Sequence, residues 1–397
     1  MKISIIIPAY NCAAPLSSTL EAISRQTVPV HEVIIIDSST TNEVHEEVSN
    51  WKEVLPIHYT GVDAAFPGRA RNIGVQKATG EWIGFLDCKT VPTDTWLQDF
   101  LTTARETESE IILGSTRFET GKTLFQQLFW ATTYGSRAHP SLPGSLVSKS
   151  AFDACGDFIS SSRAGEDLEW ISRARAKGIT ITSSPNSPTS YRDLPKSFSE
   201  AIGKHYSYAM ANAKINVRVG QKRLYLLTIL ILMTLMVSEW NAVFAGWDVQ
   251  GHLYISHITK IYLGLLIVAY AAYRLRIHSQ KLNRELELFR RVYLLTLFLL
   301  ITGLIYNWND IFANWNESSV FYISHITKLY LLSLTVAGIA FRGIFKPLRN
   351  DVKRSFLFPW RWLGAGILGL TLDIAKAPGY IWGALLEITR LRLLKKD

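Results

Sequence analysis

The sequence has few cysteines and none in a paired motif. Only three occur in 397 residues, Cys12, Cys88 and Cys155, and no two of them form a Cys-x-x-Cys unit. All three lie in the first part of the chain, well before its long apolar runs. We therefore expect free thiols in a domain that faces the cytosol.

The N-terminus lacks a secretory signal peptide. The apolar run within MKISIIIPAYN is short and ends at Pro8, whereas a signal peptide has a longer apolar core and a cleavage site of small residues. We expect this stretch to form the first strand of a folded domain.

Acidic residues are outnumbered by basic ones. The chain has 42 Lys and Arg against 33 Asp and Glu, a formal net charge of +9. Such an excess suits either nucleic acid or an anionic membrane surface. Many of the basic residues flank apolar runs, which favours the cytoplasmic face of a lipid bilayer, so no nucleic-acid partner is expected.

The composition changes near Val219. Before it the chain resembles a soluble α/β protein, and after it runs of Leu, Ile, Tyr and Trp alternate with basic clusters. We predict three parts: a cytosolic domain over 1–219, a transmembrane region over 220–345, and a basic, amphipathic tail over 346–397. The tail is expected to lie on the membrane surface as a pair of amphipathic helices.

Strand-like and helix-like stretches alternate in the first part. The apolar runs Ile3–Ile7, Glu32–Asp37 and Trp82–Leu86 predict strands covered on both faces. The alternation predicts an α/β fold with a mostly parallel sheet, right-handed crossovers and flanking helices.

Two of these runs end on an acid, Asp37 and Asp87. Open α/β sheets bind their ligands at the carboxyl ends of the strands, so the two acids together predict a nucleotide site. A single acid in such a place more often caps a turn. Lys89 stands two residues after Asp87 and would point to the same side of an extended segment.

Three motifs carry a resemblance to a known family. Ala70–Gly74 reads Ala-Arg-Asn-Ile-Gly, Phe85–Lys89 reads Phe-Leu-Asp-Cys-Lys, and Glu166 precedes Asp167. These are similar to the Ala-Arg-Asn-x-Gly helix start, the Asp-x-Asp turn and the Glu-Asp pair of the family 2 nucleotide-sugar glycosyltransferases, which have the GT-A fold. The resemblance extends over residues 1–210.

The resemblance implies a role for each motif. Asp167, supported by Glu166, would be the base that takes the proton of the acceptor hydroxyl in an inverting displacement. Without the resemblance, the same two acids would be ordinary residues of a helix N-terminus. The donor-binding residues that the resemblance implies are Pro8, Ala9, Tyr10, Asp37, Arg71, Asp87 and, at the leaving diphosphate, Arg192. Lys89 is added to them as a phosphate contact because it would point to the same side as Asp87.

Lys89 stands where the family has the second acid of the Asp-x-Asp turn. In the family those acids help to hold a divalent cation, Mg or Mn, at the diphosphate. A charged lysine does not ligate a metal, so several interpretations stay open. Asp87 and other groups hold the metal, or Lys89 is itself the cation beside the diphosphate. The plainest alternative is that Lys89 only packs.

The second half contains an internal repeat. Residues 223–275 and 291–343 align without a gap, and the segment Tyr254–Lys260 recurs unchanged as Tyr322–Lys328. Each repeat holds two apolar segments, which predicts four transmembrane helices arranged as a duplicated hairpin. Their apolar cores are shorter than the roughly 20 residues that a bilayer needs, so interfacial hairpins are the alternative.

Two further features bear on the membrane region. His257 and His325 recur with the repeat; polar residues at the membrane interface explain them better than a metal pair, because no Cys or carboxylate shares their spacing. The basic clusters lie before the first span, between the second and third, and after the fourth. The positive-inside rule then predicts an integral protein of a bacterial-type inner membrane, with the catalytic domain and the C-terminus in the cytoplasm.

The leading hypothesis is a membrane-anchored inverting glycosyltransferase of polysaccharide biosynthesis. It would move a sugar from a nucleotide-sugar to a lipid-linked or membrane-associated glycan. One alternative, similar to dolichyl-phosphate mannose synthases, has polyprenyl phosphate as acceptor; that phosphate is already ionised and needs no base. Another is a non-catalytic transporter or scaffold with a nucleotide-binding regulatory domain, against which the few ionisable residues within the predicted spans count.

Overall fold

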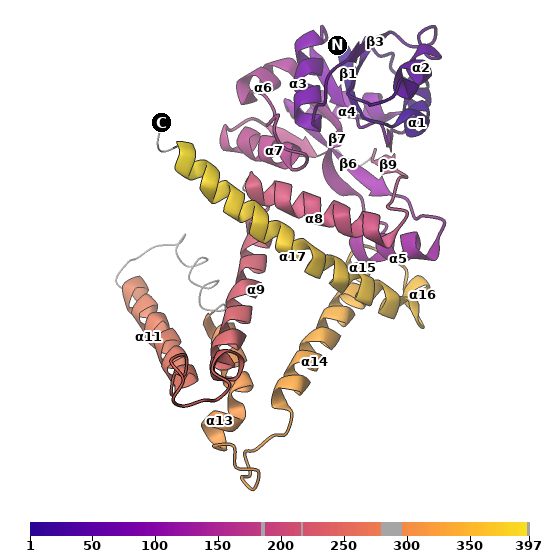
Figure 1. Ribbon diagram of the computed structural model, residues 1–397. Helices are drawn as coiled ribbons and strands as arrows, with labels where there is room; N and C mark the ends of the chain where they lie inside the picture. The colour runs from indigo at the N-terminus through magenta and orange to yellow at the C-terminus, as the bar shows by residue number, and fades with distance from the viewer. Residues whose placement is uncertain (184–186, 216, 279–295, 395–397) are drawn as a thin grey trace. The chain divides into compact units, whose positions relative to one another are not determined.

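The computed structural model describes residues 1–183, 187–215, 217–278 and 296–394. They form two compact units, and the tail belongs to the first of them. The first unit joins Met1–Arg218 to Gly338–Asp397, and the second is Val219–Ala337. Figure 1 labels the elements of both.

The first unit is built on one mixed sheet with the strand order β3-β2-β1-β4-β7-β6-β9-β5, and β8 also pairs with β6. Strands β1 to β4 pair in parallel, as predicted, while β7 runs antiparallel to both β4 and β6. The expectation of a mostly parallel sheet is thus corrected at β7, because the chain returns beside β6 after α5. The strands are β1 (Ile3–Ala9), β2 (Glu32–Asp37), β3 (Ile57–Gly61), β4 (Trp82–Phe85), β5 (Thr90–Val91), β6 (Ile111–Phe118), β7 (His139–Ser148), β8 (Ile181–Ser183) and β9 (Thr189–Tyr191).

The central strands bury both faces. Ile5 and Ile7 of β1 face one hydrophobic core, and Ile6 between them faces another. This explains why the run is apolar throughout rather than alternating with polar residues. Helices α1, α2 and α4 cover the first face, and α3, α6 and α7 cover the second. Their bounds are α1 (Ala13–Ser24), α2 (Glu43–Ser49), α3 (Pro67–Lys77), α4 (Trp96–Thr107), α6 (Lys149–Cys155) and α7 (Glu166–Ala176).

The C-terminal segment packs against the first unit. Its longest element, α17 (Arg361–Leu394), lies along α8 (Phe198–Lys214) and also contacts α5 (Leu124–Thr133) (Figure 1). Phe129, Ala201 and Leu372 of these helices share a third core. The tail therefore contains one long helix with Pro378 inside it, not the expected pair. Three short elements precede it: the π-helix η1 (Phe341–Phe345), α15 (Lys346–Arg349) and α16 (Arg354–Leu357).

The second unit is helical. Its labelled helices are α9 (Val219–Ser238), α10 (Trp240–Phe244), α11 (Ile258–His278), α13 (Trp308–Phe312) and the greater part of α14 (Ile326–Ala340). In the described part of the chain, one helical stretch, Ile326–Arg349, is long and apolar enough to cross a membrane, with 24 residues and a mean hydropathy of 1.4. Ile258–Val268 and Thr296–Tyr306 are shorter apolar helices. The third predicted span begins outside the described residues, and the arrangement of four spans stays a prediction.

The same hydrogen-bonded loop occurs twice in this unit. The indole of Trp240 donates to a carbonyl 13 residues later at 2.8 Å, and Trp308 does so at 2.7 Å. The amide of Asn241 donates to a carbonyl 14 residues later at 2.7 Å, and Asn309 forms the same bond at the same distance. Corresponding residues of the two aligned segments thus fix corresponding loops.

Candidate active site

Arg71 joins two of the three motifs that the sequence singles out. Its Nη2 donates to Asp87 Oδ1 at 2.8 Å, and its Nη1 donates to Glu166 Oε1 at 2.7 Å. Only 4% of the Arg71 side chain and 5% of the Glu166 side chain are exposed, against 38% for Asp87. One buried guanidinium therefore holds the end of β4 next to the start of α7.

The charged groups of this cluster shift one another's pKa values. Burial alone would lower the pKa of Arg71, but Asp87 and then Glu166 outweigh it and raise that pKa. Burial raises the pKa of Glu166, and the guanidinium of Arg71 opposes the shift. Arg71 therefore stays positively charged, while Asp87 turns its exposed part toward solvent at the carboxyl edge of the sheet.

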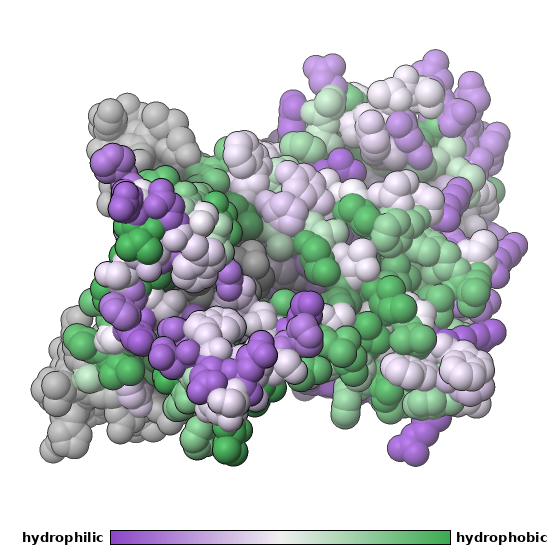
Figure 2. Space-filling model, turned by 60° about the horizontal axis from the view of Figure 1, so that its bottom comes forward, coloured by the Kyte–Doolittle hydropathy of each residue, from purple (hydrophilic) through white to green (hydrophobic). Residues whose placement is uncertain are grey.

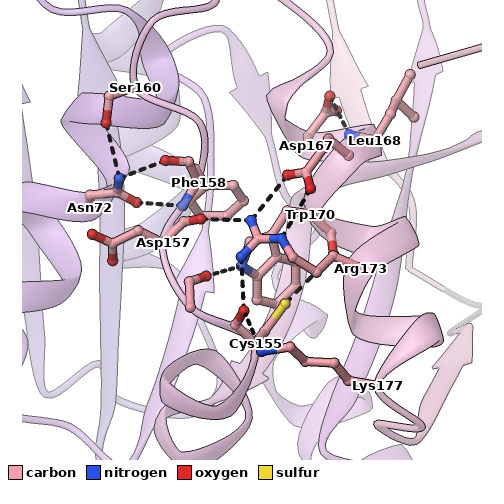
Figure 3. Close-up of polar contacts among 12 residues, drawn as sticks. Asn72, Cys155, Asp157, Phe158, Ser160, Asp167, Leu168, Trp170, Arg173 and Lys177 are labelled. Atoms are coloured by element: carbon pink, nitrogen blue, oxygen red, sulfur yellow. Dashed lines mark hydrogen bonds and ion pairs between the residues drawn. The ribbon is translucent and has the colours of Figure 1, made fainter. Parts of the chain in front are cut away.

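The start of α7 is fixed from two sides, as Figure 3 shows. On one side the Asn72 amide nitrogen of α3 donates to the Phe158 carbonyl, and its oxygen accepts from the Phe158 amide, both at 2.9 Å. On the other side Arg173 donates to the carbonyls of Cys155 and Asp157 at 2.8 and 2.6 Å. These bonds hold the first part of the loop that leads into α7 against both α3 and α7 itself.

Asp167, the expected base, lies at the N-terminus of α7. Its Oδ1 accepts from the Leu168 amide at 2.8 Å (Figure 3), and the side chain is half-buried. Gly165 before this helix has φ of +85°, and a Cβ there would lie 2.3 Å from the Asn212 amide oxygen of α8. Glycine is needed at this position, since it adopts that backbone angle and lets α8 approach.

Asp37 ends β2, one strand removed from Asp87, which follows β4. Two strand spacings put these positions about 10 Å apart across the sheet. The Asp37 carboxylate accepts from the Tyr59 hydroxyl at 2.8 Å and from the Ser39 amide at 2.9 Å. Burial and then this bond raise the pKa of Tyr59 to about 12, so the phenol stays a donor.

The first strand ends beside Asp37. Pro8 is half-buried, Ala9 is buried, and Tyr10 is 58% exposed. The Ser38 amide donates to the Ala9 carbonyl at 3.0 Å, which ties the end of β1 to that of β2. Tyr10 thus presents an exposed ring at the same edge of the sheet as Asp37.

Lys89 forms an ion pair with Asp193, which the sequence did not single out. Lys204 of α8 also lies here: its Nζ is 5.9 Å from the centre of the Tyr191 ring and 5.7 Å from that of Tyr208. Burial and then the charge of Lys89 lower the pKa of Lys204. Lys204 and Tyr208 are four residues apart and therefore lie on the same face of one helix. This spacing is the sequence feature that could have indicated them as a pair.

Tyr208 links these groups to the carboxylate cluster. Burial raises its pKa, and Asp87 and Glu166 raise it further, while Lys89 acts in the opposite direction. The pKa of the Tyr208 phenol thus responds to charges of both groups, Asp87 and Glu166 on one side and Lys89 on the other.

Arg192 faces another way. Its Nε lies 3.0 Å from a Glu119 oxygen, and 63% of its side chain is exposed. Its neighbours along the chain, Tyr191 and Asp193, point instead to Lys204 and Lys89. In an extended segment alternate residues face opposite sides, which explains the difference.

Asp87 is the residue expected to hold a divalent metal, and this expectation stays a prediction. Asp87, the expected ligand, gives one oxygen to Arg71, and the position two residues later is a lysine paired with Asp193. Among the described residues, no group of three His, Cys, Asp or Glu side chains gathers, although a metal at a diphosphate needs only one or two protein carboxylates. Cations at this edge are supplied by Arg71, Lys89 and Lys204.

Comparisons with known proteins point to glycosyltransferases. Residues 4–164 match the family model described as Glycosyl transferase family 2. Glycosyltransferase AglE of Haloferax volcanii is 24% identical over 246 residues, which cover 58% of this chain and 80% of that protein. The poly(ribitol-phosphate) beta-glucosyltransferase of Bacillus spizizenii is 30% identical over 138 residues, which cover 33% of this chain and 22% of that protein. A solved structure of S. aureus TarS 1–349 with UDP-GlcNAc has a TM-score of 0.41 at 18% identity, covering 52% of this chain and 66% of that chain.

The mixed sheet with flanking helices defines an α/β domain of GT-A-like fold. Residues 4–164 match the model of glycosyltransferase family 2, and with the named glycosyltransferase relatives this match makes the protein a glycosyltransferase. The chain spans most of the Haloferax relative but about a fifth of the Bacillus one.

Proposed function

We propose that the protein is an inverting glycosyltransferase that uses a nucleotide-sugar donor and an acceptor held at a membrane. The observation that carries this proposal is the Arg71 bridge, which joins Asp87 to Glu166 next to Asp167. The nucleotide-sugar donor follows from the family match, and S. aureus TarS has been solved in complex with UDP-GlcNAc, a donor of that class.

The reaction needs one base and one anion-stabilising group. Asp167 takes the proton of an acceptor hydroxyl while the oxygen forms a bond to the anomeric carbon. The bond from that carbon to the diphosphate oxygen breaks, and the nucleoside diphosphate leaves with the electron pair. Asp37 and the end of β1 hold the nucleoside, and Arg71 and Asp87 fix the edge where the diphosphate lies.

Lys89 and Lys204 supply positive charge to the leaving diphosphate in this proposal. Two fixed ammonium groups in a partly buried site stabilise developing negative charge without a metal. We expect Lys89→Met to lower the turnover rate by about 10- to 100-fold, the scale of losing one electrostatic contact. A chelator at millimolar concentration should leave the wild-type rate unchanged. Full loss on chelation, with Lys89→Met unimpaired, would show a metal-dependent reaction instead.

The acceptor distinguishes two versions of the proposal. A hydroxyl acceptor on a lipid-linked glycan requires the Asp167 base, whereas an ionised polyprenyl phosphate does not. Membranes that contain the protein should be incubated with a panel of labelled nucleotide-sugars and extracted with organic solvent. Activity that Asp167→Asn abolishes supports the hydroxyl acceptor; activity that it retains supports the phosphate acceptor.

Membrane attachment is part of the proposal. It is supported by the apolar stretch Ile326–Arg349 and by Ile258–Val268 and Thr296–Tyr306, which are shorter. Exposed apolar side chains also occur on α17, among them Ile367, Ile374 and Trp382. Figure 2 shows hydrophobic residues gathered over a broad area of one side of the molecule, with hydrophilic residues along its margin. The protein should remain in the membrane pellet after alkaline carbonate washing; its release would contradict integral insertion.

A further inference from the structure

A second site is present in the first unit. A cavity of about 1020 Å³ lies between the β6–β7 strands and the η1–α15 segment. Among the residues that the structure describes, those lining it include none of Arg71, Asp87, Lys89 and Glu166. The cavity is therefore distinct from the proposed catalytic cluster.

The walls of this cavity are cationic. Arg137, Arg342, Lys346 and Arg349 line it, and none of the described lining residues is an acid. Arg342 is 4% exposed, so its charge is buried within the wall. Four like charges around one space repel one another, and an anion between them relieves that repulsion.

One of the lining cations is paired with an acid of α17. Asp373 of α17 lies 3.2 Å from Arg342 Nε and 3.0 Å from Lys376 Nζ, so one carboxylate serves two cations. Burial and then the charge of Lys376 lower the pKa of His205 on α8 to about 4. Positive charge therefore adds to burial in keeping His205 neutral beside this cluster.

The cavity also has an apolar side. Phe341 and Phe345 of η1 line it, yet 57% and 65% of their surfaces are exposed. An inorganic ion would not cover these rings. A ligand with an anionic head and an aliphatic chain would neutralise the cations and cover the rings at the same time.

We propose that this cavity binds the phosphate group of a lipid, a phosphomonoester or diphosphate carried on an aliphatic chain. Arginine suits such a group, because its planar guanidinium donates two parallel hydrogen bonds to phosphate oxygens. The cations of η1 and α15 lie in the C-terminal part of the apolar stretch Ile326–Arg349, toward the headgroups if that stretch crosses a bilayer. The position of these cations near the headgroups rests on the membrane attachment proposed above. The charge of the cavity and the exposure of its rings do not depend on that attachment.

Arg137 distinguishes the proposed site from the basic cluster that ordinarily flanks a membrane helix. It lies just before β7, far in sequence from the apolar helix, but it lines the same cavity as Arg349. Lys353 and Arg354 are matched controls, since they are exposed cations that follow the same apolar helix and are not among the described lining residues.

The test is direct binding to the full-length protein in detergent, measured by thermophoresis. The probes are farnesyl diphosphate, dihexanoyl phosphatidic acid, inorganic phosphate and farnesol. We expect one or both phosphorylated lipids to bind at least about tenfold more tightly than inorganic phosphate or farnesol. The double variant Arg137→Gln/Arg349→Gln should weaken that binding about tenfold or more, while Lys353→Gln/Arg354→Gln should leave it unchanged.

The outcomes show which class of lipid supplies the phosphate group. Binding of farnesyl diphosphate alone indicates an isoprenoid carrier, and binding of phosphatidic acid alone indicates a bilayer phospholipid; each supports the proposal. The proposal would be overturned if inorganic phosphate or farnesol bound as tightly as the phosphorylated lipids. It would also be overturned if the double variant bound them as tightly as the wild type. Lys89→Met should keep the lipid binding, so a failure of the proposed transfer reaction is distinguishable from a failure of this site.

Discussion

At the residue scale, a buried arginine determines the geometry of the candidate site. Arg71 contacts carboxylates from two different elements, and its side chain is 4% exposed. A buried ion pair of this kind is costly to break, because one partner is left charged without its counter-ion. Lysine would not replace this residue, since it lacks the fork that reaches two acids at once.

Arg71→Met should therefore destabilise the protein as well as inactivate it. We expect a loss of about 3–5 kcal/mol of unfolding free energy, mostly from the stranded Glu166. The measurement is thermal unfolding of the detergent-solubilised protein. Combining Arg71→Met with Glu166→Gln should recover part of the loss, and Arg175→Met, an exposed arginine of α7, is the control. Equal stability of Arg71→Met and the wild type would show that the bridge is not formed.

Lys204 gives the reaction a testable pH dependence. Burial and then Lys89 lower its pKa, so it loses its proton at a lower pH than an ordinary lysine as the pH rises. If its charge assists the leaving diphosphate, the rate falls on the alkaline side as that proton leaves. Lys204→Arg keeps its charge and should move the alkaline limb of the pH–rate profile to higher pH. If the alkaline limb does not move in this variant, the group that titrates is not Lys204.

The site could be predicted in part from the sequence. Arg71, Asp87 and Glu166 lie in local motifs, and the structure brings these three together. Asp193 and Lys204 could not be assigned in the same way, because their place beside Lys89 depends on how β9 and α8 pack. Local spacing carries no information about such contacts until the fold is known.

At the element scale, the packing of α17 on α8 depends on small residues. A Cβ at Gly379 would lie 2.5 Å from the Tyr206 carbonyl oxygen, and one at Gly383 would lie 2.4 Å from that of Met210. Close backbone approach of two helices requires glycine at such positions. A Cβ at Gly203, on α8, meets nothing within 4 Å.

Gly379→Ala and Gly203→Ala form a matched pair of variants. Both replace a helical glycine by alanine, which alone favours the helix by up to about 1 kcal/mol. Gly203→Ala should accordingly keep or raise the unfolding temperature. Gly379→Ala should lower it, since overpacking costs about 1–3 kcal/mol. Identical shifts in the two variants would mean that α17 does not pack as described.

At this scale too, some elements of the fold could be predicted from the sequence and others could not. The strands β1, β2 and β4 are apolar runs bounded by turns, and the structure has them nearly as predicted. The antiparallel direction of β7 and the packing of the tail on α8 depend on partners distant in sequence. The glycines of α17 made that segment look interrupted, whereas two of them, Gly379 and Gly383, are points where α8 approaches it.

At the scale of the whole molecule, the two units have different tasks in our proposal. The first carries the residues that match glycosyltransferase family 2 and the cationic cavity, and the second carries two copies of one loop among apolar helices. Transfer to a membrane-held acceptor requires both in one chain. Label from the donor should therefore appear in the organic extract and not as a water-soluble product.

The most direct test compares label transfer by the wild type and by Asp87→Asn in the same membranes. Asp87 is needed with either class of acceptor, and its replacement leaves Arg71 with one carboxylate instead of two. Asp153→Asn, an exposed residue of α6, is the control. We predict that Asp87→Asn lowers the initial rate by about 100-fold or more while Asp153→Asn does not change it. Equal rates for Asp87→Asn and the wild type would contradict the central claim that the Arg71-bridged carboxylates form the catalytic centre.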